Sequence, residues 1–336
     1  MNSLIAEFPP AAAKEQRPRT PLKSERPDDR PYHQPVLLAQ TLALLEPAPG
    51  KLLVDGTLGG GGHTEAFLKT GARVIGIDQD PQALAFAGTR LSAFGAQFQA
   101  VRANFEEIGT VLDGLGVTGI DGALLDIGVS SWQLDAPERG FSFQENGPLD
   151  MRMNPDAPVS AADLVNTASA EELTRIFREL GEEPAAKRVA VQIVRDRENR
   201  PLQTTFDLVR SVEKVLPRRG RTHPATKVFQ ALRIAVNREL EVLESALNAF
   251  SARLNPGGRF GVITFHSLED RMVKQFFKAR STEWLDRPEW PEPRRNPEFQ
   301  FRLVTPKPVV ASEDEQKQNP RSRSAKLRVV EQLYVA

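Results

Sequence analysis

The residues best suited to bind a nucleotide lie between Lys51 and Asp78. Residues 51–54 are apolar enough for a short buried strand that ends at Asp55, and residues 59–62 are four consecutive glycines. A helical stretch over 64–69 and a second strand over 73–77 follow, with Asp78 at that strand's carboxyl end. Glycine lets a backbone pass close to a ligand, and a carboxylate placed here can accept hydrogen bonds from ribose hydroxyls. This order of elements predicts a βαβ nucleotide-binding unit.

The spacing of the glycines narrows the choice of nucleotide. The dinucleotide fingerprint G-x-G-x-x-G fits no frame, because neither residue 64 nor residue 65 is glycine, and this disfavours an NAD-dependent dehydrogenase. The pattern Asp-x-x-x-Gly-x-Gly does fit, from Asp55 to Gly61, and it resembles the first motif of class I S-adenosylmethionine (SAM) methyltransferases. A glycine-rich loop that merely turns the chain is the alternative, which the flanking strands and Asp78 disfavour.

The composition limits the chemistry and the partners. The 336 residues include no cysteine, which excludes disulfides, cysteine-ligated metal sites and every cysteine-nucleophile mechanism. Lys and Arg (44) balance Asp and Glu (44), so a polyanionic partner would have to be bound by local basic patches. No apolar run approaches the length of a membrane span and the N-terminus lacks the apolar stretch of a signal peptide. We therefore expect a cytoplasmic protein without a membrane partner.

The pattern of elements predicts an α/β fold. Residues 1–31 are rich in proline and charge, which predicts a disordered extension. Third and fourth strands are expected over 98–101 and 122–126, and the alternation of strands with helices predicts a parallel, doubly wound sheet. Ligands of such a sheet bind at the carboxyl ends of its strands.

After the fourth strand the pattern becomes helical. Residues 140–220 contain no convincing strand, and Ser169-x-x-Glu172 is a capping box before an apolar stripe, so we expect a small helical insertion. One long helix with a continuous buried face is expected from about 224 to 254, followed by a strand over 259–265. Residues 281–320 read as loop, and strands over 325–330 and 332–335 are expected to close the sheet as an antiparallel edge.

Eight segments together resemble one family. They are HQPVLL (33–38), DGTLGGGGHT (55–64), DGALLDIGVSSWQLD (121–135), RGFSFQENGPLDMRMNPDAP (139–158), GEEPAAKRVAVQIV (181–194), HPATKVFQALRIAVNREL (223–240), GGRFGVITFHSLEDRMVK (257–274) and NPRSRSAKLR (319–328). Their order and content resemble the bacterial small-subunit ribosomal RNA cytosine-N4 methyltransferases, the RsmH or MraW family. Each motif alone is weakly specific, but the ordered set is very specific and covers nearly all of 33–328.

The resemblance implies a class I methyltransferase, Rossmann-like domain over 32–138 and 222–336, with a helical substrate-recognition domain inserted over 139–221. It implies SAM as methyl donor and, as acceptor, N4 of a cytidine near the decoding P site of 16S rRNA, with the assembled small subunit as the expected substrate. A homodimer stays open. The family's SAM contacts map onto Gly61, Gly62, His63, Asp78, Phe105, Asp126 and Gln133. Helix capping by Asp78 or His63, and a core position for Phe105, are the competing interpretations.

The chemistry of the acceptor suggests further candidates. Methylation at cytosine C5 requires a cysteine and is excluded, whereas an N4 amine needs positioning and an acceptor for its hydrogens. Asp126 and His266 are the candidates for catalysis, and no metal is expected. Trp132, Phe141 and Phe143 could stack on the base, although each is more often a core residue. Arg218, Arg219 and Arg221 could contact RNA phosphates. A non-catalytic RNA-binding factor is the third class considered, which the intact glycine loop and the two acids disfavour.

Overall fold

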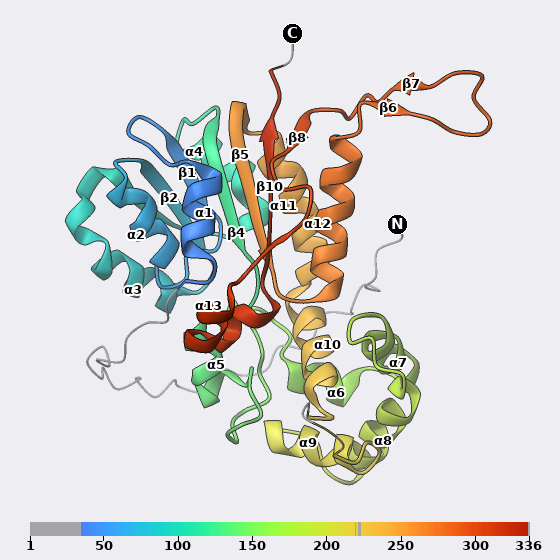
Figure 1. Cartoon of the computed structure of the whole chain (residues 1–336). Helices are drawn as coiled ribbons and strands as arrows, with labels where there is room; N and C mark the ends of the chain where they lie inside the picture. Colours follow the sequence, from blue (N-terminus) through green and yellow to red (C-terminus); the bar gives the residue numbers. More distant parts are fainter. Residues whose placement is uncertain (1–34, 219, 221–222, 335–336) are drawn as a thin grey trace. The chain divides into compact units, whose positions relative to one another are not determined.

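The computed structural model describes residues 35–218, 220 and 223–334, except for the side chains of Ser131 and Trp132. Its main sheet has the order β3-β2-β1-β4-β5-β10-β8, with β9 paired to β10 (Figure 1). Strands β1 to β5 are mutually parallel, whereas β10 pairs antiparallel with β5, β8 and β9. This is the predicted doubly wound α/β sheet, completed by antiparallel strands. The predicted disordered extension and His33 lie outside the described residues.

The bounds of the elements match most expectations closely. The strands are β1 (Leu52–Asp55), β2 (Arg73–Asp78), β3 (Phe98–Arg102), β4 (Ile120–Asp126), β5 (Leu254–Thr264), β8 (Phe301–Leu303), β9 (Val309–Val310) and β10 (Lys326–Gln332). A separate hairpin consists of β6 (Trp284–Leu285) and β7 (Arg294–Arg295). The helices beside the sheet are α1 (Leu38–Leu45), α2 (Gly62–Lys69), α3 (Pro81–Arg90), α4 (Ile108–Gly114), α11 (Glu239–Ser251) and α12 (Ser267–Arg280).

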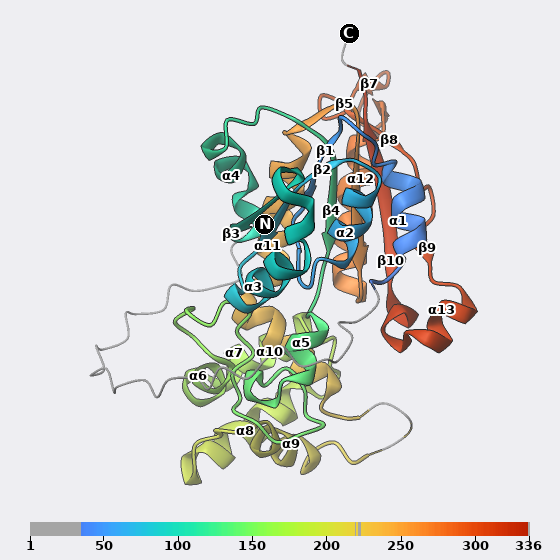
Figure 2. The same cartoon turned by 90° about the vertical axis from the view of Figure 1, so that its left-hand side faces the viewer.

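Helices cover both faces of the sheet because its central strands are apolar on both. Leu53 packs with α1, α2 and α3 on one face, and the next residue, Val54, packs with α4, α11 and α12 on the other. Figures 1 and 2 show these two layers. Successive strand residues point to opposite faces, so a fully apolar strand must be covered twice.

The helical segment follows β4, as predicted. It contains α5 (Ser131–Asp135), α6 (Ala161–Thr167), α7 (Ala170–Glu179), α8 (Ala186–Asn199) and α9 (Thr205–Glu213), and it shares one apolar core with α10 (Thr226–Asn237). Among the described residues from 137 to 218, no strand joins either sheet. The domain boundaries at 139 and 221 remain a prediction. No helix in the described part of the chain is long and apolar enough to cross a membrane.

The prediction of a single long helix is wrong, because the helix is interrupted at Arg238. This residue has a left-handed backbone (φ 50°), which ends α10 and begins α11. The apolar stripe continues through this interruption, but its two halves pack in different hydrophobic cores. Phe229 and Leu232 of α10 pack in the helical segment, whereas Leu243 and Phe250 of α11 pack on the sheet.

The expected closing edge is also corrected. Strand β10 lies inside the sheet, between β5 and β8, so the antiparallel edge is formed by β8 and β9 instead. Residues 254–258, expected to end a helix, already belong to β5, which is irregular opposite residues 120–122. The 281–320 loop contains four short strands and helix α13 (Glu313–Gln318).

Candidate active site

A cavity of about 370 Å³ lies at the carboxyl ends of β1, β2, β3 and β4, where a doubly wound sheet binds its ligands. Four segments that directly follow these strands line it, together with the start of the described chain and parts of the helical segment. Six of the seven predicted SAM contacts are in its lining: Gly62, His63, Asp78, Phe105, Asp126 and Gln133. The volume is in the range of small-molecule sites.

Gly61, the seventh predicted SAM contact, is not in the cavity lining and precedes α2. It has a left-handed backbone (φ 74°) and caps α2 from its N-terminal side. A Cβ atom on Gly61 would lie 2.9 Å from Cδ1 of Leu91. Both facts demand glycine here, because the left-handed region and this close approach are unfavourable for other residues.

Asp78 joins the glycine loop to the end of β2. Its Oδ2 accepts a hydrogen bond from Gly59 N (2.8 Å) and its Oδ1 accepts one from Asp80 N (2.9 Å). Burial raises the pKa of the Asp78 carboxyl to about 6, and the two backbone donors only partly offset this. Each oxygen can accept a further hydrogen bond, so the carboxylate can bind a diol in the cavity.

Asp126 and His63 lie next to each other in the lining of the cavity. Nε2 of His63 lies 3.5 Å from Oδ2 of Asp126. Oδ1 of Asp126 and both ring nitrogens of His63 are enclosed and have no hydrogen-bond partner among the described residues. Thr57 orients the end of β4, because its Oγ1 accepts from the Asp126 backbone N–H (2.7 Å). Buried polar atoms are normally paired, so this site has unused capacity to bind a ligand.

Gln133 contacts Asp80, a buried acid at the N-terminus of α3. Nε2 of Gln133 lies 3.4 Å from Asp80 Oδ2, and Oδ1 of Asp80 caps α3 by accepting from Gln82 N (2.9 Å). Arg139 also donates to Asp80 Oδ2 (2.7 Å). Asp80 therefore connects α3 with two residues that follow β4.

The predicted substrate residues are not gathered at the cavity. Phe141 is buried in the helical core, and Phe143 packs against Phe229 and His223 (ring centroids 4.9 and 4.6 Å apart). Arg218 is exposed and pairs with Glu213. The side chain of Trp132, and Arg219 and Arg221, lie outside the described residues. Phe105 borders the cavity and packs against the sheet core, and its contact with SAM stays a prediction.

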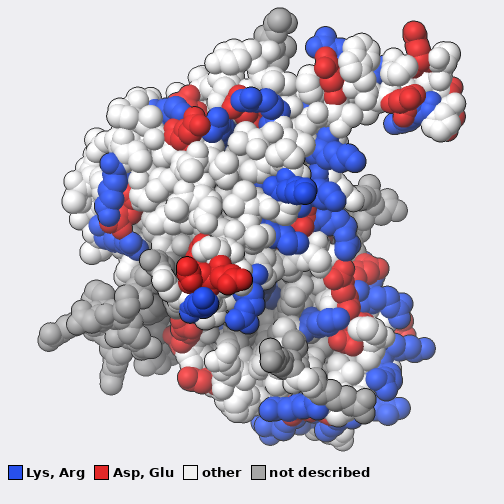
Figure 3. Space-filling model, viewed as in Figure 1, with Lys and Arg blue, Asp and Glu red and all other residues white. Residues whose placement is uncertain are grey.

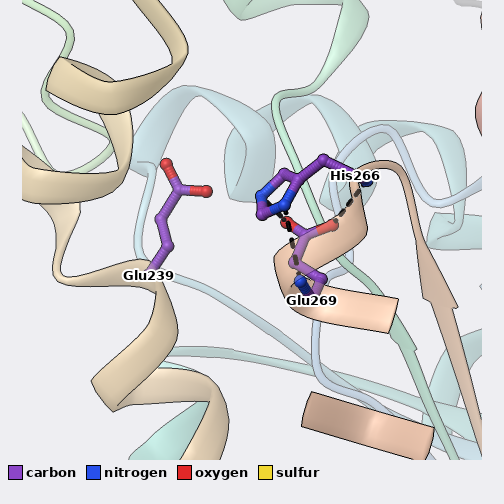
Figure 4. Close-up of side chains that lie close together, drawn as sticks. All are labelled: Glu239, His266 and Glu269. Carbon is purple, nitrogen blue, oxygen red and sulfur yellow. Dashed lines mark hydrogen bonds and ion pairs between the residues drawn. The ribbon is translucent and has the colours of Figure 1, made fainter. Parts of the chain in front are cut away.

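His266 is not in the cavity lining but lies in a buried cluster with Glu239 and Glu269 (Figure 4). Its Nδ1 accepts from Glu269 N (3.4 Å), so the neutral ring carries its proton on Nε2, which faces Glu269 Oε1 at 2.9 Å. Both oxygens of Glu239 accept from Arg233 (2.8 Å each). The printed contacts therefore form two pairs, His266 with Glu269 and Arg233 with Glu239.

Glu239 binds Arg233, a cavity residue that the sequence analysis missed. Its guanidinium lines the cavity, and the negative charge of Glu239 keeps its pKa raised despite burial. An arginine within the apolar stripe of α10, followed six residues later by a glutamate, was the available signal. Met153 also lines the cavity; its N–H donates to Oδ1 of Asn237 (2.7 Å), and no sequence pattern indicated that contact.

Comparisons with known proteins identify the family of this chain. The family model described as "MraW methylase family" matches residues 30–333. The chain is 50% identical over 309 residues to the ribosomal RNA small subunit methyltransferase H of Heliobacterium modesticaldum, covering 90% of this chain and 99% of that one. It is 51% identical over 304 residues to the protein of the same name from Anaeromyxobacter sp. (strain Fw109-5), covering 90% and 98%.

Among solved structures, an rRNA methylase from Streptococcus thermophilus is similar with a TM-score of 0.38 and 13% identity, over 89% of this chain and 93% of that one. That likeness is too distant to carry an argument about function. The family match spans nearly the whole chain, and the sequence relatives are matched almost end to end. The chain belongs to the MraW methylase family.

Proposed function

We propose that this protein transfers a methyl group from SAM to the N4 amine of a cytidine in the 16S rRNA of the small ribosomal subunit. Membership of a methylase family and relatives named as small-subunit rRNA methyltransferases support the reaction class and the RNA. One observation carries the site assignment. Asp78 and Asp126, at the ends of the strands on either side of β1, line one cavity, and Oδ1 of Asp126 has no hydrogen-bond partner among the described residues.

The cavity residues fit SAM in two parts. Asp78 accepts from the ribose hydroxyls, and Phe105 lies after β3 where it can cover the adenine face. The loop around Gly62 lets the backbone approach the ligand, while Gln133 and Asp126 follow β4 on the other side. SAM supplies an electrophilic methyl group on a sulfonium sulfur, whose transfer forms the N4–C bond, breaks the S–C bond and leaves one surplus proton on N4.

Asp126 has the properties that an amine acceptor requires. The lone pair of the cytosine amine is delocalised into the ring, so the amine must be held in line and its hydrogens accepted for the lone pair to point at the methyl group. Oδ1 of Asp126 offers such an acceptor without losing any bond of the free protein. The chain has no cysteine, so the cysteine-dependent methylation of cytosine C5 is not an alternative.

The RNA-binding part of the proposal rests on local charge. Basic side chains gather over α7 to α9, although Figure 3 shows them mixed with acidic ones over the face in view. A net charge of zero gives little general attraction for free RNA. We therefore propose that the assembled small subunit, near its decoding region, is the substrate.

The test is transfer of tritium from labelled SAM to small subunits prepared from cells that lack this activity. Nucleoside analysis of the digested 16S rRNA is expected to show label in N4-methylcytidine. Protein-free 16S rRNA, used at the same concentration, is expected to accept far less label. Label in any other nucleoside would contradict the N4 assignment, and equal labelling of protein-free rRNA would contradict the substrate assignment.

A further inference from the structure

His63, one of the predicted SAM contacts, is a buried imidazole whose ring nitrogens have no task within the described part of the protein. Its side chain is 6% exposed, lies in the first turn of α2 and lines the cavity. Neither ring nitrogen has a hydrogen-bond partner among the described residues, and no side chain caps α2. The capping role considered from the sequence is thus not taken up. We infer that His63 receives, by way of Asp126, the proton that the target amine loses. The inference rests on the proposed N4 methylation.

Carboxylates flank this imidazole on two neighbouring strands. Asp126 at the end of β4 lies 3.5 Å from Nε2. Asp55 at the end of β1 is fully buried and accepts from Oγ1 of Thr64 (2.7 Å); burial raises the pKa of its carboxyl, and a positive charge on His63 opposes that rise. Glu65, on α2 itself, is engaged by Lys69 and Arg90, and Asp78, which lines the same cavity, is engaged by two backbone donors.

This arrangement favours a positive charge on the ring at the moment when one must be accepted. As the methyl group is transferred and N4 becomes more acidic, the proton passes from N4 to the carboxylate of Asp126, and from there to Nε2 of His63. Asp126 returns to its ionised form, and its negative carboxylate lies beside the imidazolium that has taken up the proton. The product is a neutral N4-methylated amine, and His63 carries the proton together with its positive charge.

A role in binding SAM is the competing explanation, and the two roles affect different measurements. A contact to SAM changes the dissociation constant of the cofactor. A proton acceptor changes the rate of the bound complex, because it acts only after N4 has become more acidic. A small base that diffuses into the space left by the ring can replace a proton acceptor but cannot replace a cofactor contact.

The experiment compares wild type with His63→Ala and His63→Gln. Single-turnover transfer from labelled SAM to small subunits is expected to slow about 100-fold in both variants, the lower end for general acid–base catalysis. Calorimetry is expected to give SAM dissociation constants within about threefold of wild type. Added imidazole is expected to restore much of the rate of His63→Ala, but to leave wild type and the filled site of His63→Gln unchanged.

His223→Gln is the matched control. His223 lies outside the cavity lining and its Nε2 contacts Glu213 (3.3 Å), so this variant is expected to retain the wild-type rate. An unchanged rate in His63→Gln would overturn the inference. So would a rate loss explained by weaker SAM binding, without rescue by imidazole. If wild type itself transferred no label to a cytidine amine, the proposed function would fail instead.

Discussion

Asp78 shows how one residue serves both the fold and the ligand. Its carboxylate ties the glycine loop and the start of α3 to the end of β2 through two backbone donors. The sequence predicted its position because acids that end parallel strands meet at one edge of a sheet. The raised pKa could not be predicted, since it results from burial under a loop whose path the sequence does not specify.

The raised pKa predicts that SAM binding depends on pH. Above about pH 6 the Asp78 carboxylate is ionised in the free protein and can accept both ribose hydroxyls; below it, protonation removes acceptor capacity. The dissociation constant of SAM is therefore expected to rise about tenfold between pH 7 and pH 5. Calorimetry at four pH values between 5 and 8 measures this.

Two variants of Asp78 test the same assignment. Asp78→Ala is expected to lose SAM binding at every pH, and Asp78→Asn to bind weakly with little dependence on pH. Because folding raises this pKa, the stability that Asp78 contributes is present at low pH and decreases as the pH rises through about 6, opposite in direction to the binding. A flat wild-type dissociation constant from pH 5 to pH 8 would contradict the assignment to the ribose.

At the scale of elements, the contact between Asp80 and Arg139 holds α3 against the segment after β4. Arg139 also donates to the carbonyl oxygens of Arg152 and Met153 (3.0 and 3.1 Å), so one side chain connects the rim of the sheet with the loop that carries Met153 into the cavity. Asp80 is almost fully buried. Removing one partner of such a pair leaves the other charge buried and unpaired.

Asp80→Ala is expected to lower the free energy of unfolding by about 3–5 kcal/mol, through loss of the helix cap and of the partner of Arg139. Asp80→Asn keeps a capping oxygen and is expected to cost less. Ser169→Ala is the matched control: Ser169 caps α7 by accepting from Glu172 N (3.0 Å) without an ion pair, so about 1 kcal/mol is expected. Urea unfolding measures all three, and equal losses for Asp80→Ala and Ser169→Ala would refute the coupling.

Some of these elements could be predicted from the sequence and others could not. The strands and helices around the glycine loop were predictable because turns, caps and apolar periods are local signals. The break at Arg238 was not, because a continuous apolar stripe does not reveal that its halves face different cores. Nor was the place of β10, since pairing partners far apart in the chain leave no local signature. Arg233 was missed for another reason: Glu239 follows only six residues later, but the break at Arg238 between them was not predicted.

At the scale of the molecule, residues 32–336 form one compact unit that joins the sheet and the helical segment. Asn237 contributes to this, because its side chain bonds both the Met151 carbonyl (2.8 Å) and the Met153 N–H (2.7 Å) next to the break at Arg238. The cavity takes residues from both parts, so binding there stabilises both together.

We therefore expect one cooperative thermal transition, which SAM shifts as a whole. At a free concentration 100 times the dissociation constant, SAM adds about 2.7 kcal/mol to the free energy of unfolding. Scanning calorimetry with and without SAM measures this. Two separate transitions, of which SAM shifts only one, would show that the helical segment is an independent domain with little coupling to the sheet.

The interior position of β10 has a consequence for how the protein is made. The ribosome synthesises β10 after every other strand of the described sheet, yet β8 pairs with β10 and β5 pairs with it along the edge that faces away from β4. Until residues 326–332 leave the exit tunnel, residues 259–264 of β5 present an unpaired edge, which can pair with another chain. Translation that stops shortly before residue 326 would therefore release an aggregation-prone product rather than a slightly shortened enzyme.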